Sequence, residues 1–153
     1  MKYFAGIAIL LVSLVLSGCS LFLPADVTGT WQGETTEEWP AGTIVESVTL
    51  FLLQSGKAIS GVIVQVRQPP DYPKEDRFEI RTGFLDGSRL YIYAVCDDTS
   101  EWDQDRMLTL TGNLSNGRMS GSVEEYLDSA LIGGVRNGTG TTGAGTWYAR
   151  KVR

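Results

Sequence analysis

The sequence contains no histidine. This absence excludes catalytic triads and general bases built on imidazole, and every zinc site that needs a histidine ligand. Basic residues are also few, and the formal net charge of −5 argues against a nucleic-acid partner, because phosphates attract basic proteins. Hydrophobic residues make up 42% of the chain and charged residues 20%. That composition predicts one globular domain rather than a disordered chain.

The first 18 residues have the layout of a removable signal peptide. Lys2 supplies a positive charge, Tyr3 to Leu16 carries no charge, and the small residues Ser17 and Gly18 follow. An uncleaved transmembrane helix is the alternative, because the uncharged stretch continues to Ala25. Small and polar residues interrupt its second half, so we favour the cleaved signal. About 135 residues then remain, enough for one domain.

Leu16-Ser17-Gly18-Cys19 resembles the lipobox of bacterial lipoproteins. In that family the cysteine becomes the first residue of the mature protein and carries a thioether-linked diacylglycerol, usually with a further acyl chain on its amino group. Two or more acyl chains give lasting membrane attachment. The residue after the cysteine is Ser20, and in this respect the chain resembles lipoproteins that are sorted to the outer membrane. The resemblance implies lipidation of Cys19, no other cofactor, and a place in the bacterial cell envelope, at the outer membrane facing the periplasm or the surface.

Apolar residues at alternate positions predict an all-β chain of eight strands. Glycine-containing pairs at 55–56, 86–87 and 116–117 are typical of tight hairpin turns, so neighbouring strands should be antiparallel. One short helix is expected near residues 126–133, because Leu127 and Leu131 are four apart and Gly133-Gly134 follows. The expected strands are Gly29–Thr35, Thr43–Gln54, Ala58–Arg67, Arg77–Leu85, Arg89–Cys96, Arg106–Leu114, Arg118–Glu125 and Gly145–Val152.

The tripeptide Gly-Thr-Trp occurs in both the first and the last expected strand, at 29–31 and 145–147. If these strands pair, the sheet closes into an up-and-down barrel without exposed edges. The Gly29-x-Trp31 motif resembles the opening of calycin-type barrels, the group of lipocalins, fatty-acid-binding proteins and avidins. The resemblance implies that a basic residue of the last strand, Arg150, packs over Trp31, and that the barrel binds a small apolar ligand. We therefore divide the chain into a signal peptide (1–18), a lipidated tether (19–27) and a barrel domain (28–153).

The segment between the fifth and sixth strands is rich in carboxylates. It is a weak candidate for calcium binding, although an EF-hand register fails because Arg106 and Gly112 fall where glycine and glutamate are needed. A solvated acidic loop is the alternative. Cys96, the only thiol left once Cys19 is acylated, is expected to be a buried small side chain without a catalytic base. The candidate calcium ligands are Asp97, Asp98, Glu101, Asp103 and Asp105.

These observations predict a membrane-anchored envelope lipoprotein, not an enzyme, whose barrel binds a small apolar ligand. The alternative is a filled barrel that acts as an interaction module for another envelope protein or a glycan. A hydrolase using the acidic loop is a distant third. Polar or small residues facing inward near one end would indicate a ligand cavity, whereas an interior filled with leucine, valine and phenylalanine would favour the interaction module.

Overall fold

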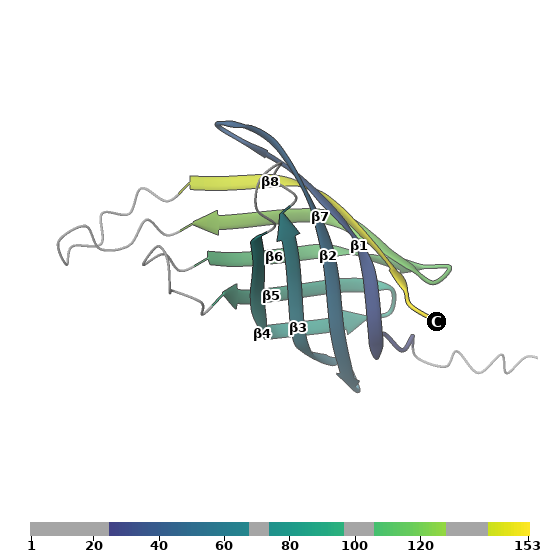
Figure 1. Ribbon diagram of the computed structural model, residues 1–153. Helices are drawn as coiled ribbons and strands as arrows, with labels where there is room; N and C mark the ends of the chain where they lie inside the picture. The colour runs from purple at the N-terminus through teal and green to yellow at the C-terminus, as the bar shows by residue number, and fades with distance from the viewer. Residues whose placement is uncertain (1–24, 68–73, 97–105, 128–140) are drawn as a thin grey trace, which may run out of the picture.

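The computed structural model describes residues 25–67, 74–96, 106–127 and 141–153. Eight antiparallel strands follow one another around a closed barrel, and the last strand pairs with the first (Figure 1). The predicted all-β up-and-down barrel is therefore confirmed. The strands are β1 (Gly29–Trp39), β2 (Gly42–Ser55), β3 (Ala58–Arg67), β4 (Lys74–Asp86), β5 (Arg89–Cys96), β6 (Arg106–Ser115), β7 (Arg118–Leu127) and β8 (Thr141–Lys151).

The described residues contain no helix. The helix predicted near 126–133 is wrong at its start, because Tyr126 and Leu127 continue β7 and lie opposite Met107 and Arg106 of β6. Pairing with a neighbouring strand satisfies their backbone polar groups better than one isolated helical turn would. Residues 128–133 lie outside the described part. Within that part, no helix is present that could span a bilayer.

The two Gly-Thr-Trp tripeptides lie on neighbouring strands, as predicted. Thr35 of β1 lies opposite Trp147 of β8, and the side chain of Trp147 is buried. Its indole Nε1 donates a hydrogen bond to the carbonyl oxygen of Thr111 in β6 at 3.0 Å. The closure of the sheet thus also places a large side chain across the barrel interior.

Three tight hairpins gather at one end of the barrel, which we call the turn end. They connect β2 to β3, β4 to β5 and β6 to β7. Asn116 and Gly117 have φ values of 51° and 70°, the positive pair that a type I′ turn requires. Gly56 and Gly87 of the other two hairpins also have positive φ, 61° and 62°. Glycine therefore allows a tight turn in each of the three hairpins, as the sequence predicted.

The apolar core fills the turn end. Trp31 is 1% exposed, and its Nε1 donates a hydrogen bond to the carbonyl oxygen of Val27 at 2.8 Å. The basic residue over this indole is Lys151, whose Nζ lies 5.7 Å from the ring centroid. Arg150, which the resemblance to calycins indicated, instead lies opposite Gln32 and is exposed. Side chains alternate along a strand, so residues 150 and 151 point to opposite faces.

An irregularity in β4 changes which of its residues face inward. The register between β4 and β5 shifts between Ile80 and Thr82. Beyond the shift Leu85 is buried, whereas Phe84 is 44% exposed and stacks on Tyr91 of β5 with ring centroids 5.2 Å apart. A bulge inserts one residue and so reverses the inward and outward positions that strict alternation predicts.

The row Val62, Val64 and Val66 of β3 lies on the outer face, while Ile63 and Gln65 are buried. The strand is apolar on both faces at several positions, so its pattern of residue types does not reveal which face is the core. The inward set of β3 is therefore less apolar than the valine row suggests. It continues through Gln65 to Arg67, far from the turn end.

Candidate functional site: a charged cluster inside the barrel

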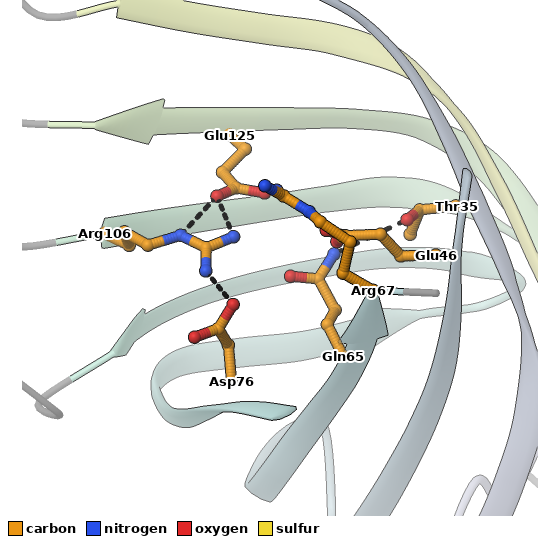
Figure 2. Close-up of polar contacts among 7 residues, drawn as sticks. All are labelled: Thr35, Glu46, Gln65, Arg67, Asp76, Arg106 and Glu125. Atoms are coloured by element: carbon orange, nitrogen blue, oxygen red, sulfur yellow. Dashed lines mark hydrogen bonds and ion pairs between the residues drawn. The ribbon is translucent and has the colours of Figure 1, made fainter. Parts of the chain in front are cut away.

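The interior of the barrel changes from apolar to polar at the end opposite the turn end. Here the inward positions of six strands carry polar or charged side chains, and we call these eight residues the charged cluster (Figure 2 shows seven of them). They come from the last residues of β1, β3 and β7 and from the first residues of β2, β4 and β6, because these strand ends meet at this end of the barrel. The cluster consists of Thr35, Glu37, Glu46, Gln65, Arg67, Asp76, Arg106 and Glu125.

Arg106 joins two carboxylates across the barrel. Its Nε donates to Oε1 of Glu125 at 2.6 Å, its Nη2 pairs with the same oxygen, and its Nη1 pairs with Oδ2 of Asp76. The guanidinium carbon lies 5.3 Å from the centroid of the Phe78 ring, which is fully buried. Arg106 therefore caps the apolar core with a cation that is held by charge-assisted hydrogen bonds.

A second arginine pairs with a different carboxylate. Nε of Arg67 donates to Oε1 of Glu46 at 2.7 Å; the Glu46 side chain is 2% exposed and that of Arg67 39%. Gln65 turns its amide nitrogen toward the hydroxyl of Thr35 at 3.5 Å, which is a long contact (Figure 2). Arg67 thus lies at the solvent side of the cluster, with Glu46 and Gln65 deeper inside.

Three glutamates converge although they come from separate strands. One carboxylate oxygen each of Glu37, Glu46 and Glu125 lies within 4.8 Å of the other two. Oε2 of Glu37, Oε2 of Glu46 and Oε1 of Gln65 are buried and have no hydrogen-bond partner among the described residues. All three are acceptors, whereas the fourth such atom in the described part of the chain, Nη2 of Arg106, is a donor that pairs with Glu125. Buried polar groups are nearly always hydrogen-bonded, so this group of oxygens lacks donors or a cation.

The electrostatics of the cluster follow from burial and like charges. Burial, followed by the charges of Glu125 and Glu46, raises the pKa of Glu37 from 4.5 to about 7. Burial likewise raises the pKa of Glu125, although Arg106 opposes this. Burial lowers the pKa of Arg106, but the charges of Glu125 and Asp76 outweigh it and the net shift is upward, so this guanidinium stays charged.

The carboxylates of the cluster outnumber its arginines by two. Glu37, Glu46, Asp76 and Glu125 face Arg67 and Arg106. Among the described residues of the cluster, full ionisation would therefore give two more negative than positive charges in a nearly closed space, which is costly. The cluster can lower that cost by protonating a carboxylate or by taking up a positive ligand.

The residues singled out from the sequence for lipidation or calcium binding are not among those of the charged cluster. Cys19 and the acidic residues Asp97, Asp98, Glu101, Asp103 and Asp105 lie outside the described part of the chain. Cys96 has a free thiol and is buried, which confirms the predicted burial of this side chain.

The charged cluster was missed from the sequence, although a signal was present. Glu46 lies two residues before the buried Val48, and Glu125 two residues after the buried Val123. Glu37 is placed in the same way in β1. A charge in phase with the apolar positions of a strand points inward, and this pattern indicates a buried charge.

No protein-family model, curated protein or solved structure matches the chain.

Proposed function

We propose that the protein is a lipid-anchored, non-catalytic binding protein of the bacterial cell envelope, and that the charged cluster holds a small polar ligand. The supporting observation is the set of unpartnered, buried acceptors on Glu37, Glu46 and Gln65. An unsatisfied buried polar group costs about 1–3 kcal/mol. A ligand that supplies positive charge or donors would recover that cost for several groups at once.

The enclosure of the cluster limits the size of the ligand. Glu37 and Glu46 are each 2% exposed. An ion or a very small molecule can reach such side chains through the end of a barrel, whereas a sugar or peptide substrate needs an open cleft around the reacting groups. This enclosure also favours binding over hydrolysis.

The apolar ligand expected from the sequence has less support. The turn end is filled by its own side chains, among them Trp31, Leu50 and Leu110. At the charged end, an apolar molecule would remove the carboxylates from water without offering them hydrogen bonds. The inward polar residues near one end of the barrel are consistent with a ligand site, but they suit a polar ligand and not an apolar one.

Native mass spectrometry of the full-length lipoprotein, extracted from membranes in mild detergent, tests the proposed ligand. We expect the folded protein to carry a mass beyond that of the lipidated chain, and Glu37→Gln to lose it. Glu38→Gln, an equal charge change on the outer face of the same strand, should keep it. A native mass equal to the denatured mass, at every charge state, would refute the ligand.

The lipid anchor has a separate test, because it depends on Cys19 alone. We expect the mature wild-type protein to remain with the membrane fraction and to exceed the polypeptide mass by the attached lipid. Cys19→Ala should abolish both properties. An unchanged mass and an unchanged membrane fraction would disprove the anchor without affecting the barrel site.

An interaction module is a second candidate, favoured by the outer face of the barrel. Phe51 and Leu53 of β2 are 46% and 63% exposed, and Phe84 stacks on Tyr91 further around the barrel. Exposed apolar side chains of this size suit the apolar surface of another envelope protein. The candidate predicts a detergent-stable complex that Leu53→Ser dissociates and Thr49→Ser does not; a monomeric wild-type protein would rule it out.

A further inference from the structure

We propose that the ligand of the charged cluster is a hard divalent cation, calcium in preference to magnesium, bound between Glu37, Glu46 and Glu125. This inference rests on the proposed function, because it names the ligand of the same site. The three proposed ligands include none of the residues of the acidic segment 97–105. Four independent features of the cluster support it.

The spacing of the three carboxylates suits one calcium ion. Calcium binds oxygen at about 2.3–2.6 Å, so two oxygens on opposite sides of the ion lie about 4.6–5.2 Å apart. One oxygen each of Glu37, Glu46 and Glu125 lies within 4.8 Å of the other two, a spacing that is compatible with contacts from one ion to all three. Magnesium needs shorter bonds of about 2.0–2.1 Å and a stricter octahedron.

The available atoms are oxygens. Oε2 of Glu37 and Oε2 of Glu46 are buried without a partner, and Oε1 of Gln65 in the same cluster adds a neutral oxygen. Hard cations such as calcium prefer carboxylate and amide oxygens, whereas zinc and copper favour imidazole and thiolate ligands. The donor set thus selects the class of metal.

The arginines leave the site open to a cation. Arg67 contacts Glu46 through Oε1, and Arg106 contacts Glu125 through Oε1. Oε2 of Glu46 therefore remains available on the other side of its carboxylate. The two ion pairs hold the glutamates in fixed orientations, as outer hydrogen bonds do for metal ligands in general.

The charge of the cluster matches a divalent ion. With all four carboxylates ionised and both arginines positive, the described residues of the cluster carry two more negative than positive charges. A divalent cation brings the cluster to neutrality, whereas a monovalent ion leaves one charge buried. Neutralisation of a nearly enclosed site is the condition under which buried charges are tolerated.

Calorimetric titration of the full-length lipoprotein in detergent, freed of metal with a chelator, tests the inference. We expect one calcium ion per chain, weaker binding of magnesium, and a melting temperature that rises with calcium concentration. Glu37→Gln should weaken calcium binding about tenfold or more, because it removes one of the three charged ligands. Glu38→Gln, its outward-facing neighbour, should bind calcium as the wild type does.

Loss of binding in Glu37→Gln would not reflect misfolding. The substitution removes like-charge repulsion, so we expect the metal-free variant to melt at the same or a higher temperature than the metal-free wild type. Calcium should then stabilise the wild type and leave this variant unchanged. Undiminished calcium binding by Glu37→Gln would overturn the inference, as would tighter binding of magnesium than of calcium.

Two further outcomes separate this inference from the proposed function. If calcium binding survives Glu37→Gln but disappears in the double variant Asp103→Asn with Asp105→Asn, the ion belongs to the acidic segment and the inference is wrong. If neither ion binds while native mass spectrometry finds an organic cation that Glu37→Gln removes, the cation site is refuted and the proposed function stands. If no ligand of any kind binds, both fail.

Discussion

Arg106 of β6 donates a hydrogen bond from Nε to Oε1 of Glu125 in β7 at 2.6 Å, inside a barrel whose other half is apolar. The two residues are not directly opposite each other, because Arg106 pairs with Leu127 and Glu125 pairs with Leu108. They meet because both side chains point inward at the same end. The contact defines the boundary between the apolar core and the charged cluster.

Arg106→Met should destabilise the barrel strongly. Removal of one partner from a buried ion pair costs about 3–5 kcal/mol, since the remaining carboxylate stays buried. Urea unfolding measures the change in unfolding free energy. Arg118→Met is a matched control, because Arg118 is exposed and only stacks over Tyr148, 4.8 Å from the ring centroid; it should cost about 1 kcal/mol or less. Equal losses in the two variants would contradict the role given to Arg106.

Glu37 should make stability depend on pH in the metal-free protein. Its pKa rises from 4.5 to about 7 on folding, through burial and the charges of Glu125 and Glu46, while Thr35 and Arg106 oppose the rise. The folded state thus favours the protonated carboxyl. Its contribution to stability is fully present below pH 4.5 and is lost as the pH rises through 7.

Urea unfolding of the metal-free wild type and of Glu37→Gln at several pH values checks this dependence. The stability of the wild type relative to the variant should fall between pH 4.5 and about 7 and then level off. Glu34 is an exposed carboxylate of the same strand. Its replacement in Glu34→Gln should leave the pH dependence of the unfolding free energy as it is in the wild type. A constant difference between wild type and Glu37→Gln across this range would refute the buried protonation.

Gly33 should not tolerate a side chain. A Cβ atom at this position would lie 1.7 Å from the carbonyl oxygen of Tyr148, so β1 and β8 would have to separate. Overpacking of this kind costs about 1–3 kcal/mol or more. Thermal unfolding of Gly33→Ala measures it. Gly87→Asn is the control: a Cβ atom added at Gly87 would have no atom within 4 Å, and asparagine tolerates the φ of +62° at this position. A fully stable Gly33→Ala would argue against the close approach of these strands.

The register shift in β4 predicts that alanine substitutions at two adjacent residues lower the unfolding free energy by different amounts. Leu85→Ala should lower the unfolding free energy by about 2–5 kcal/mol, because Leu85 is buried. Phe84→Ala should cost about 1 kcal/mol or less, because Phe84 is 44% exposed and its main contact is the stack on Tyr91. Denaturant unfolding compares the two. A larger loss for Phe84→Ala would show that strict alternation continues through β4.

Much of the barrel could be predicted locally. Alternating residues located all eight strands, and glycine at 56, 87 and 117 located the tight turns, where φ is positive. These features depend on interactions within a strand or between neighbouring strands, so a short stretch of sequence contains them. The helix at 126–133 failed at Tyr126 and Leu127 because pairing with β6 outweighs the local spacing of leucines.

The sequence by itself determined the antiparallel strands, their turns and the repeated tryptophan motif of the two strands that close the sheet. Only the tertiary structure decided that glutamates far apart in the chain face one another inside one end of the barrel, that Lys151 rather than Arg150 covers Trp31, and that Phe84 points outward. The reason is that residue types set the period of a strand, whereas closure and register determine which distant side chains share the interior.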